Sequence, residues 1–89
     1  MKRDKLLDSA KDLVNGPRAR DYGDAYENHE RVARLWSVIL DKEITVPQVY
    51  QCLTALKLAR LIVTPTHLDS WRDIAGYASL GGEIDGKGK

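Results

Sequence analysis

Hydrophobic residues recur at helical spacing in four separate stretches of the chain. Within residues 3–15, 25–40, 46–62 and 67–80, apolar positions follow one another at intervals of three and four, which places them on one face of an α-helix. Short segments containing glycine, proline or charged residues separate these stretches. The pattern predicts an all-α protein, a small antiparallel bundle of four helices without a sheet.

The third stretch, residues 46–62, is hydrophobic around most of its circumference. The polar side chains that interrupt it are Gln48, Gln51, Thr54, Lys57 and Arg60. A helix that is apolar nearly all round is usually packed by other helices on several sides. The pattern therefore predicts a central helix in which Cys52, Leu53 and Leu56 are buried.

Local signals predict where the helices begin and end. Thr45 and Gln48 have the T-x-x-Q spacing of a capping box at the start of the central helix. Asp24 is the predicted N-cap of the helix over residues 25–40. Gly81-Gly82 is predicted to end the fourth helix, because glycine favours helix termination. These limits predict one helical domain over residues 1–82 and a disordered tail over residues 83–89.

Composition narrows the class of protein. The 89 residues suffice for one domain, and 43% hydrophobic with 30% charged residues is typical of a soluble globular chain. The net charge of +1 argues against a strongly basic nucleic-acid binder and gives no long-range attraction to an anionic membrane. No stretch has the length and hydrophobicity of a signal peptide or a membrane span, so an intracellular location is expected.

The short chain and its apolar central helix together predict self-association. A domain of this size hides only roughly 60–65% of the surface that its unfolded chain exposes. Three other short helices do not easily cover a helix that is apolar on all sides. We therefore expect a homodimer that shares this core.

Two pairs of carboxylates are candidates for chemistry. Glu27 and Glu30 lie three residues apart on one helix face, and Asp69 and Asp73 lie four apart on the fourth helix. Carboxylates clustered in this way can share a hard divalent cation such as Mg²⁺. A structural alternative exists for the first pair, because Asp24 with Glu27 also forms a helix-capping pattern that the helix dipole favours.

Two cations of the central helix, Lys57 and Arg60, need either solvent or anionic partners. They can form internal salt bridges with the acids of the neighbouring helices, or they can hold the phosphate groups of a ligand. Gly76 costs stability inside a helix, so it predicts the close approach of another backbone or of a ligand.

Several short runs of the sequence resemble a known family. They are YGD at residues 22–24, ENH at 27–29, LW at 35–36, LKLARL at 56–61 and DIAGYASL at 73–80. Together they resemble a family of small helical domains encoded by bacteriophages and prophages, over about residues 6–84. The resemblance implies a phage-type protein in the cytoplasm of the bacterial host.

More distantly, the layout is similar to the all-α nucleotide pyrophosphohydrolases of the MazG and dimeric dUTPase type. Those bundles hold Mg²⁺ with an E-x-x-E pair on one helix and an E-x-x-D pair on another. Glu27 and Glu30 match the first pair, whereas Asp69 and Asp73 depart from the spacing of the second.

This similarity implies hydrolysis of a nucleoside triphosphate between its α and β phosphates. Its implied Mg²⁺ ligands and catalytic residues are Glu27, Glu30, Asp69 and Asp73. The implied substrate-binding residues are Lys57 and Arg60 for the phosphates, and Asn28 and Tyr77 for the base or sugar.

Two other function classes remain open. A non-catalytic module that binds a host protein, or sequesters a nucleotide, needs the same fold and no metal. A DNA-binding regulator is the third hypothesis, because residues 45–63 resemble the recognition-helix region of winged-helix proteins. Against it, that helix leaves no polar side for a DNA groove, and no basic wing follows.

Overall fold

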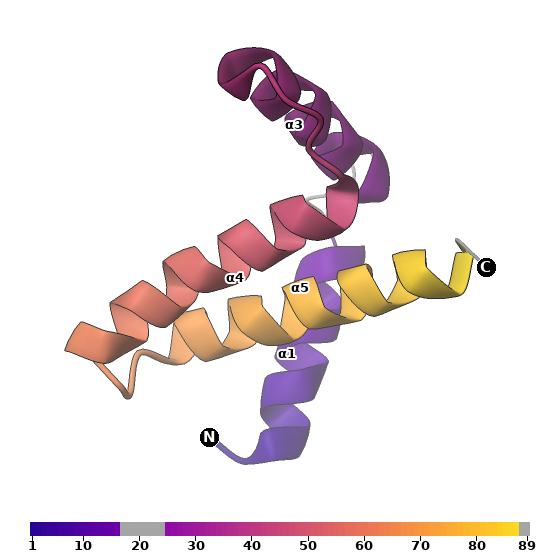
Figure 1. The fold of residues 1–89 in the computed structure, drawn as a ribbon. Coiled ribbons are helices and arrows are strands. Elements are labelled where there is room, and N and C mark those ends of the chain that lie inside the picture. Colours follow the sequence, from indigo (N-terminus) through magenta and orange to yellow (C-terminus); the bar gives the residue numbers. More distant parts are fainter. Residues whose placement is uncertain (17–24, 88–89) are drawn as a thin grey trace.

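The computed structural model describes residues 1–16 and 25–87, and side chains as far as residue 84. Within these residues the chain forms the helices α1 (Arg3–Asn15), α3 (Ala25–Leu40), α4 (Val46–Val63) and α5 (Leu68–Lys87), and no strand (Figure 1). The predicted all-α class is therefore confirmed. The predicted cap Asp24 lies outside the described residues.

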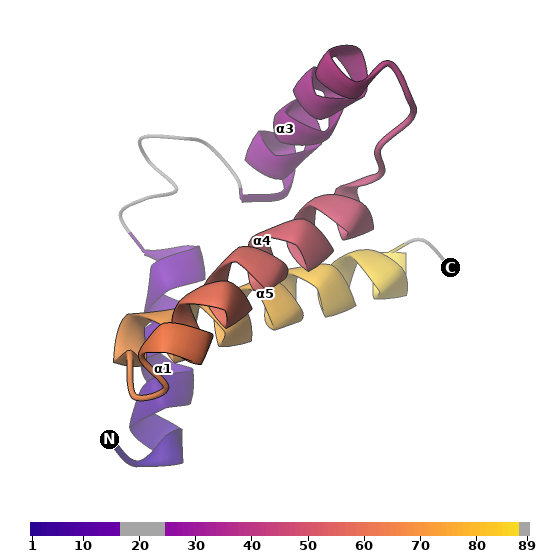
Figure 2. The ribbon, with the colours of Figure 1, turned by 60° about the vertical axis from the view of Figure 1, so that its left-hand side comes forward.

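α3 and α4, like α4 and α5, follow one another in the sequence and pack together, and so do α1 and α5, which are far apart in it. α4 and α5 run antiparallel and side by side along most of their length, and α1 crosses α5 (Figures 1 and 2). α3 packs on the first turns of α4 and then points away from the other helices (Figure 2). Consequently α3 and α5 cover two parts of α4, while no helix of the described residues lies against the outer side of its later turns.

The start of α4 has the predicted capping box. The Thr45 amide donates to Gln48 Oε1 at 2.9 Å, and the Gln48 amide donates to Thr45 Oγ1 at 3.3 Å. The two side chains thus satisfy two backbone donors that a helix start leaves unpaired. The helix ends at Val63, one residue beyond the prediction, and the Thr64 amide donates to the Arg60 carbonyl.

α5 does not end at Gly81-Gly82, as the sequence predicted, but continues to Lys87. Each glycine costs an isolated helix about 1 kcal/mol relative to alanine. The helix nevertheless runs through both glycines; Gly81 passes close to α4, where a Cβ would lie 3.9 Å from the Tyr50 ring, and Gly82 has open space beside it. Residues 83–87, predicted as part of a disordered tail, are helical, and residues 88–89 lie outside the description.

Gly76 marks the predicted close approach of another element. A Cβ at this position would lie 3.3 Å from Val14 Cγ1 of α1. This glycine therefore lets α1 cross α5 at short range, and a neighbouring helix, not a ligand, is the reason for it.

The core is small and lies where the helices meet. Val49 and Ser70 are fully buried, and the other buried residues of the described chain are Ala10, Ala33, Tyr50, Leu61 and Gly76. The predicted burial of Cys52 and Leu56 is wrong: Cys52 is exposed and Leu56 is 63% exposed, while Leu53 is half-buried. The reason is that these two residues point away from α5, on the side of α4 that no helix covers.

Candidate functional site

The four predicted metal ligands do not converge in the structure. Glu27 and Glu30 lie on α3, and Asp69 and Asp73 lie on α5. Among the described residues, no three His, Cys, Asp or Glu side chains come together in a group that could hold a metal ion. The residues present therefore do not fit the predicted Mg²⁺ centre.

Asp73 instead forms an ion pair with Lys57. Asp73 Oδ2 lies 3.0 Å from Lys57 Nζ, and both side chains are only 17% exposed. Arg72 extends the network, with its guanidinium 3.6 Å from Asp69 Oδ1 and 3.9 Å from Asp73 Oδ1. Lys57 therefore forms an internal salt bridge, the alternative to phosphate binding that its sequence position left open. The pair fixes α4 against α5.

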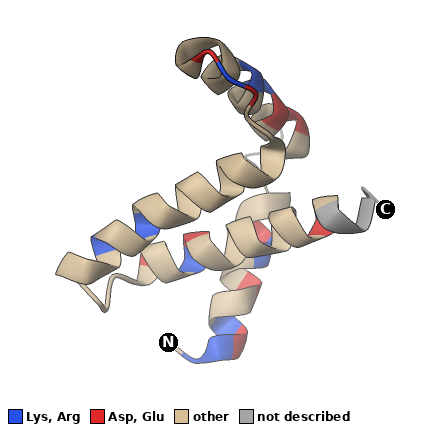
Figure 3. Ribbon diagram, viewed as in Figure 1, with Lys and Arg blue, Asp and Glu red and all other residues tan. Residues whose placement is uncertain are grey.

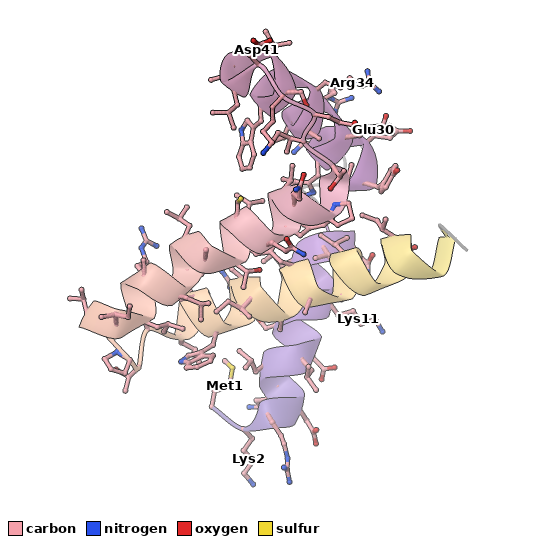
Figure 4. All side chains as sticks on the ribbon, viewed as in Figure 1. Met1, Lys2, Lys11, Glu30, Arg34 and Asp41 are labelled. Carbon is pink, nitrogen blue, oxygen red and sulfur yellow. The ribbon has the colours of Figure 1, made fainter. Side chains whose placement is uncertain are left out.

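The other predicted site residues lie apart from this network. Glu30 pairs with Arg34 one turn along α3, and both side chains project from that helix (Figure 4). Glu27 and Arg60 are exposed, and Asn28 is half-buried. Lys57, predicted to act with Arg60 on phosphates, is engaged by Asp73.

Tyr77 belongs to a cluster of rings that the sequence analysis did not find. His29 of α3 lies edge-on to Tyr50 of α4, with ring centroids 4.7 Å apart, and His29 Nδ1 is 2.9 Å from the Tyr50 hydroxyl. Tyr77 of α5 completes the cluster, 6.5 Å from His29 and 6.4 Å from Tyr50. Three helices therefore meet at three rings.

Burial lowers the pKa of His29 below its ordinary value, and a hydrogen bond with the backbone of Ala25 opposes this shift in part. The cluster lies about two turns, or ~10 Å, along α4 from Lys57. A sequence signal for it exists, since His29 lies three and four residues before the apolar Val32 and Ala33 and so shares their helix face. The cluster holds α3 on the bundle.

A hollow opens on the other side of the molecule, between α1 and Arg72. Its lining residues are Met1, Lys5, Asp8, Ser9, Asp12, Leu13 and Arg72. Its charged lining residues are two acids, Asp8 and Asp12, and two bases, Lys5 and Arg72, and none of the predicted site residues takes part.

Exposed hydrophobic side chains are the most distinctive surface feature. One group, which we call the α3 patch, consists of Leu35, Val38, Ile39 and Leu40, which are 58–79% exposed. A second group, the α4 seam, consists of Cys52, Ala55, Leu56, Ala59, Ile62 and Val63, all exposed. Figure 3 shows α4 with two basic positions and otherwise uncharged. Monomeric soluble proteins seldom leave such contiguous apolar surface open to water.

None of the helices among the described residues combines the length and hydrophobicity that a bilayer crossing requires.

Comparison with known proteins identifies the family. Residues 5–85 match the model of a domain of unknown function, DUF6378, and the chain belongs to this family. It is 45% identical over 76 residues to the Gene 55 protein of Mycobacterium phage L5, and 39% identical over 75 residues to the Gene 55 protein of Mycobacterium phage D29. Each match covers 84% of this chain but only 49% and 50% of the relatives, so the chain spans about half their length. No solved structure matches.

These relatives confirm the predicted resemblance to a family of phage proteins. The finer similarity to nucleotide pyrophosphohydrolases is not shown by them and stays a prediction.

Proposed function

We propose that this member of the DUF6378 family is a non-catalytic protein-binding module that inserts α3 into an apolar groove of a host protein. The observation that carries the proposal is the α3 patch. Leu35, Val38 and Ile39 stand at i, i+3 and i+4, so their side chains project from one side of the helix. This spacing is the one by which amphipathic helices occupy hydrophobic grooves of other proteins.

The surroundings of the patch support binding. Arg34, paired with Glu30, flanks it on one side, and the exposed Asp41 and Lys42 follow its last turn (Figure 4). Protein interfaces commonly combine an apolar centre with a polar rim of this kind. α3 also extends beyond the other helices, so a partner can reach it without displacing any of them (Figure 2).

The helix end is fixed in a form suited to recognition. Asp41 adopts a positive φ of 50°, and the amides of Asp41 and Lys42 donate back to the carbonyls of Val38 and Ser37. This is the hydrogen-bond pattern of a Schellman motif, which satisfies two carbonyls at the end of α3. The patch is thus presented on an ordered helix, which lowers the conformational entropy lost on binding.

The test is site-specific cross-linking followed by measured binding. A photoreactive amino acid at Val38 in the host cell should capture a protein that the same group at Lys11, exposed on α1, does not capture. With the captured protein purified, Val38→Glu should weaken binding at least tenfold, which corresponds to about 1.4 kcal/mol. The matched variant Lys11→Glu should bind like wild type.

Two results would contradict the proposal. One is unchanged affinity of Val38→Glu for the captured protein. The other is metal-dependent release of pyrophosphate from a nucleoside triphosphate that Glu30→Gln abolishes, since that would support the hydrolase prediction.

A further inference from the structure

The outer side of α4 carries a second apolar surface, separate from the α3 patch. The α4 seam runs from Cys52 to Val63 over about three helical turns, and its members recur at intervals of three and four residues. Ile62 and Val63 are 83% and 84% exposed, the highest values among the large hydrophobic residues that the structure describes. We propose that a second copy of this chain packs on the seam, so that α4 of each copy lies against α4 of the other across a two-fold axis.

The charge distribution favours a second copy as the occupant. The charged residues between Cys52 and Val63 are Lys57 and Arg60. Lys57 is turned to Asp73 at 3.0 Å, away from the seam. The exposed Arg60 lies at the edge of the seam, beside Leu56 and Val63. A two-fold interface brings the same surface of both copies together, so like charges in its centre would repel. The seam carries none. The net charge of +1 also adds little long-range repulsion between copies.

The surface area of the chain leaves room for an interface of the required size. The chain exposes 6658 Å², whereas a compact monomer of its 10.0 kDa is expected to expose about 5,200 Å². The excess of roughly 1,400 Å² belongs to the whole chain, the α3 patch included, and exceeds the area of about 1,000 Å² that each subunit of an obligate dimer buries at the least. The radius of gyration, 13.7 Å, likewise exceeds the value of about 12 Å for a compact chain of this length.

The shape of the seam permits close contact. Ala55 and Ala59 lie one turn apart near the middle of the seam, with larger side chains on either side of them. Helix axes approach to about 8 Å where small side chains meet, and the larger neighbours can then interdigitate. α3 points away from these turns, so it does not obstruct a second α4 (Figures 1 and 2).

Mass in solution tests this inference directly. Sedimentation equilibrium at micromolar concentration should give about twice 10.0 kDa for wild type. Ala59→Glu and Ile62→Lys should each return a mass near 10.0 kDa with an unchanged helical circular dichroism spectrum. Both positions are exposed in the single chain, so a charge there leaves the fold intact and is buried only in the dimer.

The matched control is Val38→Lys, which puts a charge on the α3 patch and should leave the dimer mass unchanged. Cys52 supplies a second measurement, because the interface covers its thiol. Maleimide should label Cys52 at least several-fold more slowly in wild type than in Ala59→Glu.

Three results would overturn the inference. They are a wild-type mass near 10.0 kDa up to the solubility limit, a dimer that survives both seam variants, and a dimer that only Val38→Lys dissociates. The last result would also place the α3 patch in self-association and so distinguish this inference from the proposed host-protein binding.

Discussion

Single residues determine how α3 is held on the bundle. His29 lies in the ring cluster with Tyr50 and Tyr77, and its Nδ1 is 2.9 Å from the Tyr50 hydroxyl. Because burial lowers the pKa of His29 below 6.5, the folded protein holds this imidazole neutral more strongly than the unfolded chain does. Protonation of His29 must therefore weaken the packing of α3 on α4 and α5.

The corresponding prediction concerns stability and pH. The unfolded chain binds the proton at higher pH than the folded protein, so the stability that neutral His29 contributes is present above pH 6.5 and is lost as pH falls through the lowered pKa. Urea unfolding at intervals between pH 8 and pH 5 should show the free energy of unfolding decreasing towards pH 5. His29→Gln, which does not titrate, should flatten this decrease. An equal decrease in both proteins would show that other groups cause it.

At the scale of helices, the ion pair between Lys57 and Asp73 connects α4 and α5. Both side chains are largely withdrawn from water, and Arg72 lies beside Asp73. Removing one member of such a pair leaves the other charge without compensation in a poorly solvated place. The pair therefore sets how α4 aligns with α5 more than it adds net stability.

This arrangement predicts different results for two aspartates on the same helix. Asp73→Asn should lower the free energy of unfolding by about 2 kcal/mol, because it leaves Lys57 unpaired. Asp69→Asn should change it by less than ~0.5 kcal/mol, since the Asp69 side chain is 67% exposed. Thermal melting with and without excess Mg²⁺ should show no stabilisation by the metal. If Mg²⁺ raised the melting temperature of wild type but not of Asp73→Asn, the predicted metal site would exist after all.

Hydrophobic spacing and capping signals predicted the helices well because these signals are local. The capping box of Thr45 and Gln48 depends on residues three apart, and the start of α4 followed from it. The end of α5 did not follow from Gly81-Gly82, because the helix runs through both glycines and brings Gly81 close to Tyr50, which is distant in the sequence. The low helix propensity of glycine predicts a helix end only where no tertiary contact outweighs it.

At the scale of the whole molecule, the relative positions of the helices determine which predicted site residues meet. Sequence spacing does not give these positions. Spacing put Glu27 with Glu30, and Asp69 with Asp73, on their own helices, but it carried no information on whether the two pairs meet. Similarly, the apolar circumference of α4 gave the correct helix and the wrong burial of Leu56, because the pattern does not state whether a neighbour comes from the same chain. An apolar side can equally belong to a core or to an interface.

The final prediction tests the resulting division of α4 into a covered and an open side. Leu61 is 7% exposed and lies in the core, whereas Leu58, three residues earlier on the same helix, is 49% exposed and is outside the α4 seam. Leu61→Ala should lower the free energy of unfolding by about 2–4 kcal/mol, through lost burial and the cavity it leaves. That loss is a large part of the total stability of a small domain. Leu58→Ala should cost less than about 1 kcal/mol, because its side chain is already half in water. Chemical denaturation of the two variants at equal protein concentration makes the comparison. Equal losses would mean that α4 is enclosed at Leu58 as fully as at Leu61, as its sequence alone predicts.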